Sequence, residues 1–210
     1  MNSDPDMETE LSKGTQHFFD LLDPEKKTTV CFRFEDDERL NWHYFPRERK
    51  GLPLGSLDEN QRGAFWRFVE TFLSAKGLKQ AQGVIQLEGI LGELEGRQQF
   101  RDPGKYYISF FIPEDQRAVP VWGWRLEGHH LSLNYVIKAG EVVAITPSFF
   151  GTNPAIVRDG PHAGMQVLDD EENLARQLAQ SLDRDQRSRA IVSDEAPADI
   201  LSRADVEFRL

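Results

Sequence analysis

The sequence predicts an α+β fold, an antiparallel sheet of about five to six strands with helices packed on one face. Residues 121–146 hold three successive runs of aromatic and β-branched side chains, which favour neighbouring strands. Residues 58–95 and 169–188 show large apolar side chains at helical spacing. Helices from these two regions would cover the apolar face of the strands.

The first quarter of the chain predicts one helix and one hairpin. Apolar side chains within residues 11–22 favour a short amphipathic helix that ends before a proline. Residues 28–34 and 40–45 are rich in β-branched and aromatic side chains and predict two strands joined by an acidic turn. Prolines and glycines then predict a loop over residues 46–55.

Two helices are expected next. Ser56 or Asp58 can cap a helix that runs to Phe72, with large apolar groups on one face. A second helical pattern covers residues 78–94, although each of its internal glycines costs about 1 kcal/mol. Close packing against a neighbouring element would explain these small residues.

A meander of strands follows a turn at residues 101–104. The continuous apolar run 106–112 predicts a buried strand. Residues 121–127, 130–138 and 141–146 predict three further strands, the last two joined by a tight turn at Ala139 and Gly140.

The expected domain organisation is simple. We expect disorder over residues 1–8 and a single α+β domain over 9–192. The domain would include a structured loop at 147–164, which carries two phenylalanines, and a helix at 169–188. Residues 193–210 would form a C-terminal tail or a truncated continuation of the domain.

Charge and composition exclude several classes of function. The net charge of −10 argues against a nucleic acid or an anionic membrane surface as a partner. The single cysteine, Cys31, excludes an internal disulfide and a cysteine-based metal cage. With no secretory leader pattern and no long apolar run, we expect a soluble, cytoplasmic protein, and the oligomeric state stays open.

Polar residues are densest in Gly123–Tyr135, whose sequence is GWRLEGHHLSLNY. Buried polar groups must find partners or meet a ligand, so this segment is the best candidate for a site. Side chains alternate along a strand, which would place His130 on one polar face with Ser132 and Asn134. His129 would point to the opposite, largely apolar face.

The leading hypothesis is a metal- or acid/base-assisted enzyme that acts on a small molecule. His130 would be a ligand or general base, Glu127 its partner, and Arg125 would hold an anionic group of the substrate. Further substrate contacts are expected from Ser132, Asn134, Asn153 and Trp124.

A divalent transition metal is the cofactor that two histidines could bind. His130 and His129 are the candidate ligands, but an ion needs three or four, and rings on opposite faces of a strand cannot both reach it. Glu127, or a histidine from another segment such as His43 or His162, would have to complete the set.

Two alternatives compete with an enzyme site. The segment could be a buried polar ladder, with Glu127 paired to Arg125 and the histidines bonded to backbone groups. The protein could also be a non-catalytic binding module that contacts a ligand or a protein partner through the loop with Phe149, Phe150 and Asn153. A solvent-reaching pocket at His130 and Glu127 would favour chemistry.

Several segments in order resemble the domain-of-unknown-function family 3500. They are Trp42–Pro46 with Arg49, Gly51 and Leu52, then Gln61-Arg62, Arg101–Pro103 with Tyr106-Tyr107, Trp122–Asn134, and Pro147–Pro154. The family name implies no activity. The resemblance also implies longer members with a second histidine motif, so this chain would lack part of a site, gain it from another subunit, or be a fragment of a longer enzyme.

Overall fold

The computed structural model describes residues 14–114, 121–200 and 204. The chain divides into two compact units, Met1–Pro154 and Ala155–Leu210, which are described separately. The expectation of one domain over residues 9–192 therefore stays a prediction. Within the described residues, no helix is long and apolar enough to cross a membrane.

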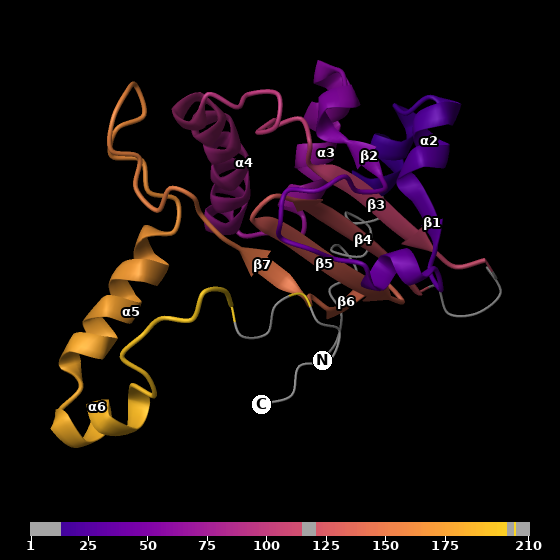
Figure 1. The fold of residues 1–210 in the computed structure, drawn as a ribbon. Helices are drawn as coiled ribbons and strands as arrows, with labels where there is room; N and C mark the ends of the chain where they lie inside the picture. The colour runs from indigo at the N-terminus through magenta and orange to yellow at the C-terminus, as the bar shows by residue number, and fades with distance from the viewer. Residues whose placement is uncertain (1–13, 115–120, 201–203, 205–210) are drawn as a thin grey trace. The chain divides into compact units, whose positions relative to one another are not determined.

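The first unit is built on a mixed sheet (Figure 1), and the predicted α+β class is confirmed. Its central order is β1-β3-β4-β5-β6, while β2 also pairs with β3 and β7 with β5. The strands are β1 (Cys31–Arg33), β2 (Leu52–Pro53), β3 (Tyr107–Ile112), β4 (Val121–Gly128), β5 (Leu131–Lys138), β6 (Glu141–Ala144) and β7 (Ser148–Phe150). The sheet is not purely antiparallel as predicted, because β1 runs parallel to β3.

The predicted meander is present, and its first hairpin is tighter than expected. Gly128 pairs with Leu131 across β4 and β5, so His129 and His130 form the turn itself and do not begin a strand. His130 adopts the left-handed conformation, with φ of 59°. The predicted turn between β5 and β6 is confirmed at Ala139 and Gly140, which have φ of 52° and 78°.

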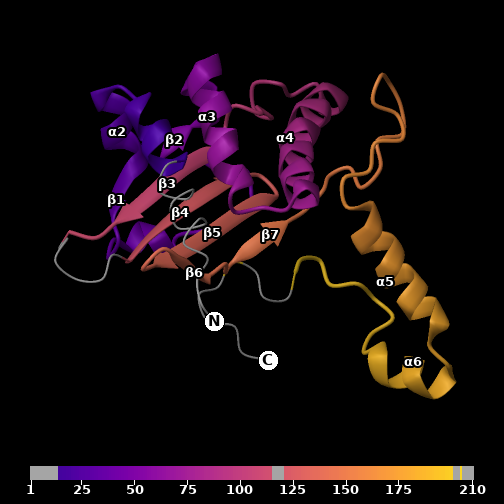
Figure 2. The same ribbon diagram turned by 180° about the vertical axis from the view of Figure 1, so that it is seen from behind.

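Helices α3 (Glu59–Glu70) and α4 (Ala75–Glu95) lie on the same side of the sheet in both views (Figures 1 and 2). Asp58, one of the two predicted caps, starts α3 and forms a capping box with Gln61. Its buried Phe68 contacts Trp124 and Phe110, with ring centroids 5.1 and 5.3 Å apart. The apolar face of the sheet therefore packs against helices.

Residues 28–45, which precede α3, do not form the predicted hairpin. Residues 14–20 are helical, as expected, but residues 28–30 continue α2 (Pro24–Val30), which Asp23 caps, and only β1 remains of the first strand. Residues 40–45 form no strand, and the 3-10 helix η1 (Asp37–Leu40) precedes them. Several of their backbone groups, those of His43 and Phe45 among them, bond to side chains instead of to a neighbouring strand.

The second unit contains α5 (Asp169–Ser181) and α6 (Arg184–Ala190) where one helix was predicted. The break comes at Asp183, whose side chain caps a new helix in a capping box with Gln186. No residue of α5 is buried, and Leu174 and Leu178 are 62% and 65% exposed. The predicted packing of residues 169–188 on the sheet involves both units and stays a prediction. Residues 1–8 and the end of the predicted tail lie outside the described residues.

Candidate functional site

The carboxylate of Glu127 is enclosed by hydrogen-bond donors on the polar face of the sheet. Oε1 accepts from Nε of Arg49 at 2.6 Å. Oε2 accepts from the hydroxyl of Ser132 at 3.0 Å and from the backbone N–H of His43 at 3.1 Å. The side chain of Glu127 is only 1% exposed. Such a carboxylate has no free oxygen to offer a substrate.

Arg125 is also committed inside the protein. Nη2 donates to Oε1 of Glu38 at 2.7 Å, and Nη1 donates to the Glu38 carbonyl at 2.9 Å. Nε lies 3.7 Å from Oε2 of Glu127. The predicted holder of a substrate anion therefore neutralises a buried carboxylate, because a buried charge requires a partner.

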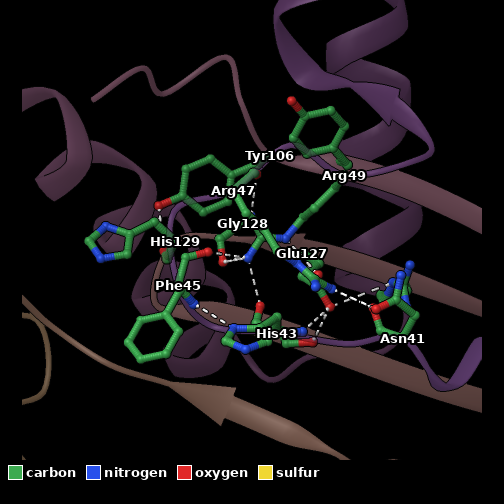
Figure 3. A network of polar contacts seen from close by, with 12 residues as sticks. Asn41, His43, Phe45, Arg47, Arg49, Tyr106, Glu127, Gly128 and His129 are labelled. Atoms are coloured by element: carbon green, nitrogen blue, oxygen red, sulfur yellow. Dashed lines mark hydrogen bonds and ion pairs between the residues drawn. The ribbon is translucent and has the colours of Figure 1, made fainter. Parts of the chain in front are cut away.

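Arg49 fastens the irregular segment 41–50 over this polar face (Figure 3). Its Nη2 lies within hydrogen-bond distance of three carbonyl oxygens, those of His43, Phe45 and Gly128, at 2.7, 2.7 and 3.1 Å. Nη1 donates to the Arg47 carbonyl at 2.9 Å. Burial lowers the pKa of Arg49, and the charge of Glu127 opposes that shift. The guanidinium thus supplies the backbone partners that a strand would have provided.

The four predicted substrate contacts do not converge. Ser132 and Asn134 lie in the polar network, where Nδ2 of Asn134 donates to the Ser132 hydroxyl at 3.0 Å and to the Pro147 carbonyl at 2.8 Å. Trp124 lies on the opposite, helix-covered face and stacks on Tyr135 at 4.7 Å. Asn153 is exposed in the loop after β7. Around Glu127, the buried polar ladder is the alternative that agrees with this geometry.

The two histidines share one side of the hairpin turn, contrary to the prediction that their rings face opposite ways. Their ring centroids are 4.0 Å apart. Strand alternation does not apply, because both residues belong to the turn. The backbone of His130 is held by Tyr44 and Gly151 through bonds of 3.0 and 2.8 Å. Burial, followed by the charge of His129, lowers the pKa of His130 to about 4, so its ring is neutral at pH 7.

His129 has the partner that a general base requires, and that partner comes from α4. Nδ1 lies 2.5 Å from Oε2 of Glu88. In the tautomer with the proton on Nδ1, the ring donates to Glu88 and its lone pair lies at Nε2. No described residue is hydrogen-bonded to Nε2. Nη1 of Arg101 lies 3.2 Å from the same Nδ1 and 3.9 Å from Oε1 of Glu88, and it can donate to Nδ1 only in the other tautomer.

A pocket of about 190 Å³ opens beside His129. Glu88 and Tyr106 line it with His129, and the phenolic hydroxyl of Tyr106 donates to the His129 carbonyl at 2.8 Å. Burial raises the pKa of Tyr106 well above its usual value, so the phenol keeps its proton. The pocket therefore has a histidine whose ring and backbone are both fixed.

Two cations in the pocket wall have no carboxylate partner among the described residues. Nζ of Lys105 contacts only the Gln99 carbonyl, at 3.4 Å. Nη2 of Arg47 donates to the backbone and side-chain oxygens of Asn41 at 3.0 and 2.8 Å. Glu48 also lines the pocket and accepts from Tyr107 at 3.3 Å. Lys105 and Arg47 therefore leave an excess of positive charge over Glu48 in this part of the wall.

The metal hypothesis gains no support from the described residues. They contain no group of three or more histidine, cysteine, aspartate or glutamate side chains that could hold an ion. Nδ1 of His43 accepts from the Phe45 backbone at 3.1 Å, and His162 is exposed in the second unit. Burial raises the pKa of Cys31 to about 11, which keeps its thiol protonated. Among the described residues, His129 and His130 thus lack the further ligands that an ion would need.

Sequence reasoning missed Glu88, Arg49 and Lys105. A signal for Glu88 was available, because it lies on the apolar stripe of α4 between Val84 and Leu91. A carboxylate at a core position of a helix requires a buried partner. Nothing in the local pattern indicated that this partner would be His129.

Comparison with known proteins gives one result. A family model described as "Protein of unknown function (DUF3500)" matches residues 6–208. No curated protein and no solved structure matches the chain.

Proposed function

The chain belongs to the DUF3500 family, and we propose that its pocket beside His129 is an acid–base site for a small anionic molecule. One observation carries this proposal. Oε2 of Glu88 lies 2.5 Å from Nδ1 of His129, while Nε2 has no partner among the described residues. A histidine oriented by a carboxylate, with its other nitrogen unused, is the arrangement of a general base.

In this proposal His129 transfers a proton, and Glu88 orients the imidazole ring of His129. Nε2 accepts a proton from the bound molecule or from a water, and the carboxylate stabilises the imidazolium that forms. Tyr106 holds the backbone of His129 through its hydroxyl. The roles first expected of His130 and Glu127 thus pass to His129 and Glu88.

The charge and size of the pocket support an anionic molecule of few atoms. Lys105 and Arg47 would bind its charged group, the role that Arg125 cannot take while it is paired with Glu38. The volume of about 190 Å³ is below the roughly 300–1,000 Å³ of pockets for drug-sized ligands. A carboxylate or phosphate of a few heavy atoms fits this description.

Nuclear magnetic resonance of the imidazole nitrogens tests the proposal on the full chain. We expect the Nδ1–H tautomer for His129 in the neutral ring and a saturable shift of its signals on addition of acetate or phosphate. An anion held by one or two charge contacts should bind with a Kd of about 1 mM. The Lys105→Gln variant should weaken this binding about tenfold and keep the tautomer.

Two outcomes would overturn the proposal. One is an Nε2–H tautomer, because the base would then point its proton at the pocket. The other is the absence of any saturable shift at His129 with either anion. The Lys79→Gln variant, which changes an exposed lysine at the other end of α4, is the matched control and should leave both results unchanged.

A further inference from the structure

A second hollow, of about 390 Å³, lies between α3 and α4. It is larger than the pocket beside His129 and falls within the usual size range of small-molecule sites, about 300–1,000 Å³. The residues that carry the argument are Leu54, Arg62, Trp66, Gln82, Gln86 and Pro103.

The floor of this hollow is made of backbone. The N–H of Gly55 donates to the Gly104 carbonyl at 3.0 Å, so the two chain segments touch there. A Cβ on Gly55 would lie 3.2 Å from Cα of Gly104, which is closer than most real Cβ contacts. Neither residue has a side chain, which allows this close approach of the two segments.

The walls suit a flat ring. Trp66 is half-buried at the pocket, Leu54 is buried, and Pro103 adds a third apolar surface. An indole binds an aromatic ring by offset or edge-to-face contact, which a chain-like ligand cannot match. The apolar part of a ligand here is therefore expected to be planar.

The polar side chains in the wall, those of Arg62, Gln82 and Gln86, are exposed and make few contacts with the protein. Nη2 of Arg62 makes two long contacts, 3.4 Å to the Leu54 carbonyl and 3.2 Å to the Leu57 carbonyl. Among the described residues, its Nε and Nη1 have no partner, and Arg62 forms no ion pair. By contrast, Arg49 and Arg125 each have a buried carboxylate.

Two amides complete the wall. Gln82 and Gln86 both line the hollow and are four residues apart in α4, which places them on one face of the helix. Neither side chain is hydrogen-bonded to another described residue. They can accept from, or donate to, a hydroxyl or amino group on a ligand.

We infer that this second pocket binds a small planar aromatic carboxylate. The ring would contact Trp66, the guanidinium of Arg62 would receive the carboxylate through its planar pair of donors, and a glutamine would bind a polar ring substituent. The pocket shares no lining residue with the site at His129, so the inference does not rest on the proposed function.

Calorimetric titration of the full chain with 4-hydroxybenzoate tests the inference, with neutral 4-hydroxybenzamide as the matched probe. We expect a Kd between about 0.1 and 1 mM for the carboxylate and binding at least about tenfold weaker for the amide. The Arg62→Gln variant should lose about tenfold for the carboxylate and little for the amide, which removes the preference. The Arg67→Gln variant, an exposed arginine on the same helix, should bind like the original protein.

Three further measurements separate the outcomes. Trp66→Leu should weaken both probes, and thermal unfolding of each variant shows whether it is folded. His129→Gln should bind 4-hydroxybenzoate unchanged, which distinguishes this site from the other pocket. Lack of any binding heat up to about 10 mM, or equal affinity of the Arg62→Gln variant for the carboxylate, would overturn the inference.

Discussion

Two buried carboxylates meet the end of the β4–β5 hairpin, and they differ in what surrounds them. Glu127 is 1% exposed and accepts from Arg49, Ser132 and a backbone N–H. Glu88 is 5% exposed, and its short contact is with the ring of His129 at a pocket. Burial of a carboxylate therefore does not mark a reactive site. An unused atom on a partner that lines a pocket is the better indicator.

The difference follows from the partners each carboxylate received. Arginine carries its donors in a rigid fork and cannot lose its charge at ordinary pH, so its pairing with Glu127 is permanent. Histidine has one nitrogen for its carboxylate and a second for something else. The first arrangement holds segment 41–50 on the sheet, and the second is suited to proton transfer.

The largest effect is expected at Glu127. The Glu127→Gln variant leaves the buried Arg49 without its counter-charge, and breaking a buried pair in this way costs about 3–5 kcal/mol of unfolding free energy. Glu88→Gln should cost only about 1–2 kcal/mol, because the ring of His129 can still donate to an amide oxygen. Urea unfolding of both variants measures the two free energies.

In ligand binding the order of the two variants should be reversed, with the larger effect in Glu88→Gln. Glu88→Gln should change the tautomer population of His129 and its response to phosphate, whereas a folded Glu127→Gln protein should keep both. Equal loss of stability in the two variants would break the distinction between a structural and a functional carboxylate.

Much of the fold could be predicted because its signals are local. The caps and apolar stripes of α3 and α4 and the alternation along β4 and β5 all lie within a few residues of the structure they determine. Alternation also predicted one polar and one apolar face of the sheet. The error at residues 40–45 arose because their backbone partners come from Arg49, a contact that no local pattern contains.

The proposed site takes one residue, His129, from the segment that the sequence predicted, and its other residues come from elsewhere in the chain. The polar density of Gly123–Tyr135 indicated a site, yet Glu127 satisfies its hydrogen bonds internally. The tight turn brings both histidine rings together, which strand alternation did not allow. Glu88 comes from a helix 41 residues earlier, so only the folded chain shows the pair.

An intermediate effect is expected from pH at His130. Its pKa is about 4 in the folded protein against 6.5 for an ordinary histidine, so between these values the unfolded chain binds a proton that the folded chain does not. Stability should therefore be complete above about pH 6.5 and fall as pH decreases toward 4. For this half-buried ring the loss is on the order of 1–2 kcal/mol, measured by urea unfolding at several pH values.

The His130→Asn variant is the control for this titration. Asparagine tolerates the left-handed conformation that His130 adopts, so the turn should persist while the titrating ring is removed. The slope between pH 6.5 and 4 should become shallower in this variant relative to the original protein. An unchanged slope would mean that the pKa of His130 is not lowered in the folded protein.

The smallest effect, and one of opposite sign, is expected at Ser109. It lies opposite Arg125 in the β3–β4 register, on the same polar face as Glu127, yet its buried hydroxyl has no hydrogen-bond partner among the described residues. Ser109→Ala removes an unpaired polar group and should raise the unfolding free energy by less than about 1 kcal/mol. Ser132→Ala is the matched change, because that hydroxyl bonds to Glu127 and Asn134, and it should cost about 1–3 kcal/mol. A loss of unfolding free energy in Ser109→Ala as large as that in Ser132→Ala would contradict this prediction. It would mean that the hydrogen bonds of the Ser132 hydroxyl to Glu127 and Asn134 add nothing to the effect of burying a hydroxyl.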